Sequence, residues 1–199
     1  MNNKRLREWC LSCQVVLNTV RFDQSDEVKV VALSLLHLAF EHHVSICNFV
    51  NTGHHGSAFA LFRPQKEAFL RGVWLLYCAD AKQINEFKSL SKLPPMKRIL
   101  CDLKTIKHFN KGLLFELLSS LKKDMDDFTH GGGAQAAMRA QGQVISSKYP
   151  EEAVQNLLSD SMLLSCFTVI HISKVGSDAN MEMQTLEAYK RLVVKRKHT

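Results

Sequence analysis

The sequence predicts an all-α protein, a helical bundle of about six to eight helices with a proline-kinked central helix. Apolar residues recur at helical spacing along nearly the whole chain, and no long segment alternates with the two-residue period of a strand. The 199 residues, 46% hydrophobic and 23% charged, can bury a full core. We therefore expect one helical-bundle domain over residues 1–199, with a basic C-terminal tail at about 190–199.

The first two helices are expected at about 4–21 and 25–50. The first carries its apolar residues on one side, as an amphipathic helix does. Ser25 or Asp26 is placed to cap the second, because a short polar side chain at this position accepts a hydrogen bond from the first turn. The segment 51–56 contains two glycines and is expected to be a turn.

The third helix is expected at about 57–81 and contains Pro64. A proline inside a helix removes one backbone hydrogen bond and collides with the preceding turn, so we expect a kink near residues 59–63. Alternatively, Pro64 begins a second, shorter helix.

Prolines and glycines divide the rest of the chain. Two prolines at 94–95 break it, and three glycines at 131–133 end a helix just after His130. The remaining helical segments are expected at 96–107, 111–129, 134–140, 150–174 and 178–195.

The composition argues against a membrane protein. The best candidate for a membrane span, Ser57–Ala79, is interrupted by four charged residues. Basic residues precede the apolar run 9–20, but polar residues interrupt this run and no small-residue cleavage site follows it. We expect a cytoplasmic protein without a membrane segment.

The cysteines and histidines predict no metal or cofactor. Six scattered cysteines in apolar helical segments are typical of buried free thiols in a reducing compartment. Cys10-x-x-Cys13 has no second pair at the spacing of a zinc site. Asp127-x-x-His130 resembles half of a di-metal motif whose second half is missing. The sequence also lacks a phosphate-binding glycine loop, a nucleophile elbow and a dinucleotide fingerprint.

Positive charge is concentrated in two segments of this chain, whose net charge is +7. Residues 82–111 hold eight Lys and Arg against Glu86 and Asp102, and the last fourteen residues hold five against Glu187. Such segments favour RNA or another polyanion as a partner. They are equally consistent with solvated helix faces and a frayed tail.

Arg63, Glu67 and Arg71 are four residues apart on the third helix and so lie in one row. Because this helix is apolar on most of its circumference, the row is expected to face the interior or a cleft. Two interpretations remain open. The row is either a buried ion-pair network that fixes helix register, or a site that binds an anionic substrate.

His130 follows three acids at a helix C-terminus, where the helix dipole disfavours negative charge. Asp126 and Asp127 stand four and three residues before it and could orient its ring, so His130 is a candidate general acid or base. Arg139 joins the site if the chain folds back. The alternative is a surface cap whose acids pair with neighbouring lysines.

Three stretches of the chain resemble a bacterial family of uncharacterised helical proteins. These stretches are Ser57–Pro64 with Glu67 and Arg71–Leu75, then Phe128–Gly132, then Tyr149–Glu151. The resemblance spans about residues 35–175. That family is similar, more distantly, to HEPN helical-bundle proteins and to abortive-infection proteins of the AbiV type. Many of these are dimeric RNases or nucleotidyl-binding partners in toxin–antitoxin and phage-defence systems.

The resemblance implies a metal-independent endoribonuclease, with a cognate antitoxin or defence partner and a homodimer. His130 would be its acid or base, and Arg63 and Arg71 would stabilise the transition state. HEPN RNases have an arginine a few residues before this histidine, whereas residues 123–125 here are Lys, Asp and Met. The second hypothesis is a non-catalytic module that binds a partner protein or small anion in the same pocket. Glu67, Arg139, Asp126 and Asp127 are the expected substrate-binding residues.

Overall fold

The computed structural model describes residues 3–89, 93–111, 113–119, 123–141, 143–176 and 179–194. These residues form ten α-helices, one short 3-10 helix and a hairpin of two two-residue strands, so the prediction of an all-α protein is confirmed. In chain order the elements are α1 (Asn3–Thr19), α2 (Glu27–Asn51), α3 (His55–Tyr77), α4 (Ala81–Lys88), α5 (Met96–Leu103), η1 (Lys107–Phe109), α6 (Leu113–Ser119), α7 (Lys123–His130), α8 (Gly133–Ala137), β1 (Ala140–Gln141), β2 (Val144–Ile145), α9 (Glu151–Val175) and α10 (Ala179–Val194).

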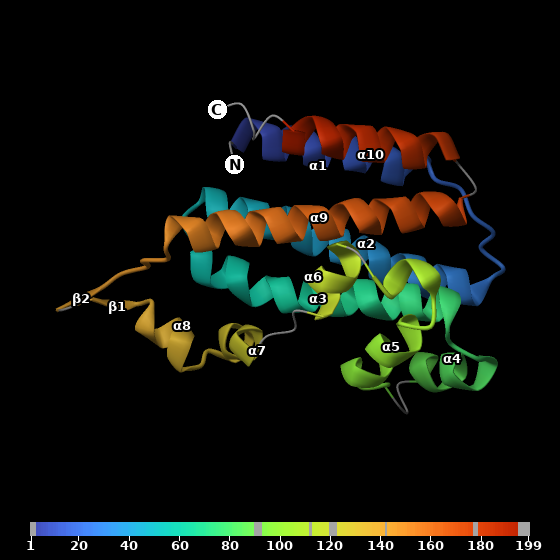
Figure 1. Ribbon diagram of the computed structural model, residues 1–199, viewed down its shortest axis with the longest axis horizontal. Coiled ribbons are helices and arrows are strands. Elements are labelled where there is room, and N and C mark those ends of the chain that lie inside the picture. The colour runs from blue at the N-terminus through green and yellow to red at the C-terminus, as the bar shows by residue number, and fades with distance from the viewer. Residues whose placement is uncertain are drawn as a thin grey trace.

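The long helices form the bundle and the short ones cover one side of it. Figure 1 shows the antiparallel pair α1 and α10 packed over α9 and α2, with α3 on the opposite side of that layer. Helices α5 and α7 both contact α3, at its C-terminal and N-terminal halves respectively. The β1–β2 hairpin projects from one end.

The most extensive packing joins α2 to α3, and Gly72 permits it. A Cβ at Gly72 would lie 2.9 Å from the Leu36 side chain and 3.1 Å from the Ala32 carbonyl oxygen. Real Cβ atoms essentially never come as close as the first distance, and the second is tighter than nine in ten real contacts, so a larger residue would push the two helices apart. This close approach sets the spacing between the α2 and α3 residues of the cleft described below.

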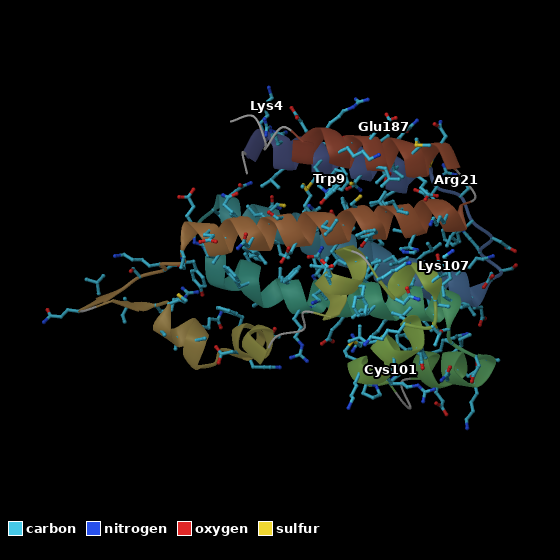
Figure 2. All side chains as sticks on the ribbon, in the orientation of Figure 1. Lys4, Trp9, Arg21, Cys101, Lys107 and Glu187 are labelled. Atoms are coloured by element: carbon cyan, nitrogen blue, oxygen red, sulfur yellow. The ribbon has the colours of Figure 1, made fainter. Side chains whose placement is uncertain are left out.

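Helix α1 is held to the bundle by Trp9. Figure 2 shows Trp9 between α1 and α9, where its side chain is fully buried. Its indole Nε1–H donates to Ser165 Oγ at 2.8 Å. The indole thus combines a large buried apolar area with a satisfied polar atom.

Helix α3 runs unbroken through Pro64, so the alternative of a second helix starting there is wrong. Proline lacks an N–H, which leaves the carbonyl oxygen of Ala60, four residues earlier, without its helical donor. The Thr129 hydroxyl, one residue before the end of α7, donates a long hydrogen bond of 3.5 Å to this oxygen. The proline therefore creates an acceptor that anchors the end of α7 to α3.

The sequence prediction differs from the structure between α3 and α9. Helix α4 and the hairpin were not predicted, although Asp80 and Gln83 form a capping box that marks the start of α4. The single helix expected at 111–129 is instead α6 and α7. Of the basic tail expected at about 190–199, residues 190–194 belong to α10 and residues 195–199 lie outside the described residues.

Two helices, α2 and α9, are long and apolar enough to cross a membrane by length and composition. They differ from the stretch 57–79 that the sequence singled out. Of their most apolar windows, 44% in α2 and 67% in α9 is buried inside the bundle. Core helices of soluble proteins pass the same test, so these two helices are weak evidence for a membrane span.

Candidate functional site

A cleft of about 340 Å³ opens between α2, α3 and α7. Its volume lies at the lower end of the range of small-ligand sites. The lining residues are Leu35, Leu38 and His42 from α2, Arg63, Pro64, Glu67, Ala68 and Arg71 from α3, and Thr129 and His130 from α7. The fold therefore brings His130 and the two arginines, 67 and 59 residues apart in sequence, to the same cleft.

The arginine–glutamate row forms two ion pairs along α3. Arg63 Nε donates to Glu67 Oε1 at 2.8 Å, and Arg71 donates to Glu67 Oε2 at 3.0 Å. These three side chains are 28%, 19% and 23% exposed, so the row lines a partly open cleft rather than the closed core. Each oxygen of the carboxylate thus accepts from a different arginine.

The pKa of Glu67 reflects a contest between burial and its two partners. Burial would raise this pKa, but the hydrogen bonds and charges of Arg63 and Arg71 outweigh burial and hold it below the usual value. Glu67 is therefore ionised at neutral pH. With both oxygens engaged, it is a poor candidate for a metal ligand or a general base.

Arg71 keeps an unfilled donor. Its Nε is buried and has no hydrogen-bond partner within the described part of the chain. A buried N–H without an acceptor costs free energy that a bound anion would recover. Guanidinium groups suit this role, because their planar donors match the oxygens of phosphate and carboxylate groups.

His42 is a cleft residue that the sequence analysis missed as a site residue. It is half-buried on α2, and burial lowers its pKa despite the opposing charge of Glu41. This side chain is thus mostly neutral at neutral pH and can accept a proton. Its spacing from Leu35 and Leu38 places the three residues on one helical face, which is the signal that could have identified it.

His130 is the last residue of α7 and is exposed at the cleft. The following Gly131 has a φ of 68°, a left-handed conformation that glycine adopts without strain, and it ends the helix. The predicted helix end beside His130 is therefore confirmed, and the last helical residue is 130 rather than 129.

The other expected site residues do not line this cleft. Asp127 caps α8: its carboxylate accepts from the Gln135 N–H at 2.9 Å, and its carbonyl from Gly132 N–H at 2.7 Å. Arg139 lies over the first turn of α3, where a Cβ at Gly56 would collide with its guanidinium group. The side chain of Asp126 lies outside the described residues.

Lys66 is a second residue of interest that the sequence analysis did not single out. It is fully buried, and its Nζ donates to the carbonyl oxygen of Leu117 at 2.8 Å. Burial lowers its pKa to about 8, although the charge of Asp160 opposes the shift. Lys66 ties α6 to α3 and does not line the cleft.

The comparisons with known proteins identify one family. A family model described as a family of unknown function (DUF6988) matches residues 36–194, which include every residue that lines the cleft except Leu35. No curated protein and no solved structure matches the chain. This family match agrees with the resemblance to uncharacterised proteins, whereas no comparison supports the likeness to HEPN and AbiV-type proteins.

Proposed function

The chain belongs to the DUF6988 family, whose function is unknown, and we propose that its α2–α3–α7 cleft binds a phosphate group of RNA. One observation carries the proposal. Arg71, whose buried Nε–H has no acceptor within the described part of the chain, lines a cleft together with Arg63 and two imidazoles, those of His42 and His130. Guanidinium and imidazole donors around one small volume are the groups that proteins use to bind phosphate oxygens.

An RNA ligand, rather than a free anion, is favoured by basic residues near the same helix. Helix α5 and the segment after it belong to the basic region 82–111, and α5 contacts α3. Lys97, Lys107 and Lys111 are exposed there, and the described side chains form no ion pair with them. Exposed lysines on an element that packs against the same helix extend the attraction of a phosphate site to neighbouring phosphates of the same strand.

Glu67→Gln separates a binding site from an ion-pair network that only fixes helix register. The substitution removes the one carboxylate among the described lining residues and keeps the size of the side chain. If the cleft binds phosphate, affinity for a short single-stranded RNA rises roughly fivefold, the effect of about 1 kcal/mol of lost charge competition. Titration of labelled RNA and the melting-temperature shift caused by inorganic phosphate measure this change.

Glu8→Gln is the matched control, because Glu8 is an exposed acid on α1 that does not line the cleft. It should leave RNA affinity within experimental error. A Glu67→Gln variant that melts earlier but binds RNA and phosphate no better than Glu8→Gln would show that the row is structural only. Stabilisation by inorganic phosphate but not by RNA would favour the small-anion module.

The two imidazoles favour a second, stronger form of this function, metal-independent cleavage of RNA. In this reaction the neutral His42 accepts the proton of a ribose 2′-hydroxyl as its oxygen attacks phosphorus. The bond from phosphorus to the 5′-oxygen breaks, and His130 donates a proton to that oxygen. Arg63 and Arg71 stabilise the charge on the phosphoryl oxygens. The products are a 2′,3′-cyclic phosphate and a free 5′-hydroxyl.

Cleavage is tested with a labelled RNA in the presence of a chelator. His42→Gln and His130→Gln should each lower the rate by roughly 100-fold or more, the usual contribution of a general acid or base. His37→Gln, an exposed histidine on α2 outside the cleft, should cleave at the wild-type rate. Binding without cleavage by the wild-type chain would leave the phosphate site standing and refute the ribonuclease.

A further inference from the structure

Outside this cleft, three potential metal ligands meet between α1 and α2. The ligand atoms of Cys10, His43 and Cys47 lie within 4.8 Å of one another, and Cys47 Sγ is 3.7 Å from His43 Nε2. His43 and Cys47 are buried, and Cys10 is partly buried. His43 and Cys47 stand four residues apart on α2, so both project from the same helical face.

Hydrogen bonds on the far side of the His43 ring fix its tautomer. The Ser161 hydroxyl donates its one proton to Gln65 Oε1 at 2.7 Å, and the Gln65 amide in turn donates to the Ser161 carbonyl at 3.0 Å. Ser161 Oγ must therefore accept from His43 Nδ1–H, to which it lies at 2.8 Å. This leaves Nε2 of His43 as a bare lone pair beside the two cysteine sulfurs.

This arrangement has the form of a metal-binding histidine. A ligating imidazole usually donates its other N–H to a protein oxygen, which orients the ring and raises its basicity. In a tetrahedral zinc site, Zn–S bonds of about 2.3 Å and Zn–N bonds of about 2.0–2.1 Å separate the sulfur and nitrogen by roughly 3.5–3.6 Å. The observed 3.7 Å between Cys47 and His43 fits this spacing.

A cavity adjoins two of these three residues. Cys10 and Cys47 line a cavity of about 630 Å³ between α1 and α2, together with Lys4, Arg7, Gln14 and Asn48. Structural zinc sites are usually closed by four protein ligands, whereas three ligands and an accessible position are typical of sites where water or a substrate completes the shell.

We propose that Cys10, His43 and Cys47 bind one Zn²⁺ ion, with the fourth coordination position open to the α1–α2 cavity. Two thiols lose their protons on binding, so the two thiolates neutralise the charge of the ion. The competing interpretation is a set of buried thiols in which Cys47 S–H donates to His43 Nε2. The pair Cys10-x-x-Cys13 is not part of either, because Cys13 is not among the three residues whose ligand atoms meet and packs instead with Trp9.

The full-length chain, stripped of metal with a chelator under a reductant, is titrated with Zn²⁺ against a chromophoric chelator. We expect one equivalent per chain. Substitution with Co²⁺ should give thiolate charge-transfer bands and the strong visible bands of tetrahedral cobalt. Cys10→Ala, at the partly buried ligand, should weaken zinc binding by more than the roughly 10–100-fold that loss of an outer partner costs.

Two further variants keep the test decisive. Cys13→Ala removes a buried cysteine one turn from Cys10 on α1 and should bind zinc as the wild type does. Ser161→Ala leaves all three ligands in place and should weaken binding by roughly 10–100-fold while keeping the cobalt bands. A wild-type chain that takes no zinc from the chelator, or Cys10→Ala that binds as tightly as Cys13→Ala, overturns the proposal.

Discussion

At the scale of single residues, α3 carries two kinds of buried charge. Glu67 and its arginines share their charges across two ion pairs and remain partly exposed. Lys66 has no solvent exposure, and its ammonium group donates to a backbone carbonyl. Burial costs this ammonium group more solvation than its carbonyl hydrogen bond and the charge of Asp160 return, which is why its pKa falls.

The lowered pKa of Lys66 predicts a pH dependence of stability. The pKa of Lys66 is about 8 in the folded chain and 10.5 in the unfolded chain. Between these two pH values, unfolding is therefore accompanied by the uptake of a proton by Lys66. The free energy of unfolding should therefore rise with pH in this window, by up to about 1.4 kcal/mol per pH unit. Urea unfolding at several pH values measures this rise in the wild type, and Lys66→Met should lack it because the variant has no ammonium group at this position.

Lys82→Met is the control for that experiment, since the Lys82 side chain is 85% exposed. It should follow the wild-type slope. Equal slopes in the wild type and Lys66→Met would show that the ammonium group is solvated in the folded protein.

Spacing along one helix determined what could be predicted at this scale. Arg63, Glu67 and Arg71 pair as their four-residue spacing indicates. His42 was missed because its role depends on α7 lying across α2 and α3, which no local pattern encodes. The proximity of Cys10 to Cys47 was missed likewise, because it depends on how α1 packs on α2, which the spacing of Cys10 and Cys13 does not encode.

At the scale of elements, the position of α7 controls the cleft. Helix α7 has eight residues, too few to be stable alone, so its place depends on contacts with α3. One of these is the Thr129 hydroxyl on the carbonyl oxygen that Pro64 leaves unpaired. The proline and the threonine thus act together to hold His130 near Arg63.

Thr129→Val tests this contact, because valine keeps the shape of threonine and removes the donor. We expect a loss of about 1 kcal/mol in the free energy of unfolding, and a severalfold weaker affinity for RNA as α7 moves. Urea unfolding and RNA titration measure the two effects. Thr129→Ser retains the hydroxyl and should behave as the wild type in both, so identical results for Val and Ser would contradict the anchoring role.

The long elements were predicted well and the short ones poorly. Helices α2, α3 and α9 repeat their apolar pattern over many turns, so their existence follows from periodicity. Between α3 and α9 the elements have eight residues or fewer, and their packing on α3 decides where each begins. The prediction of a single helix at 111–129 is wrong, because the apolar pattern of this segment does not show the division into α6 and α7.

At the scale of the whole molecule, the distribution of charge matters more than its sum. The exposed lysines belong to α5 and the segment after it, and α5 packs against α3. Figure 2 shows Lys107 toward the end of the molecule where α4 and α5 lie. Helices α1 and α10 form the opposite layer of the bundle. If RNA binds as proposed, only the first of these surfaces should contribute phosphate contacts.

Replacing Lys97, Lys107 and Lys111 by Gln should reduce the salt dependence of RNA binding. For a single strand, each lost phosphate contact lowers the slope of log K against log salt by about 0.7, or roughly 2 for three contacts. Fluorescence titrations over a range of salt concentrations give the slope. Arg7→Gln with Lys190→Gln, on the α1–α10 layer, should leave it unchanged, and an equal effect from both sets would show non-specific attraction.

The hydrogen bond from Trp9 to Ser165 also has a consequence for folding during synthesis of the chain. Its two residues are separated by 156 positions, so at a synthesis rate of about 5–20 residues per second α1 waits roughly 10–30 s for its partner helix. During that interval the partner available to α1 is α2, whose Phe40 belongs to the same apolar cluster as Trp9. The docking of α1 against α9 is therefore completed only after α9 has been made, whereas the residues that line the α1–α2 cavity come from the first two helices.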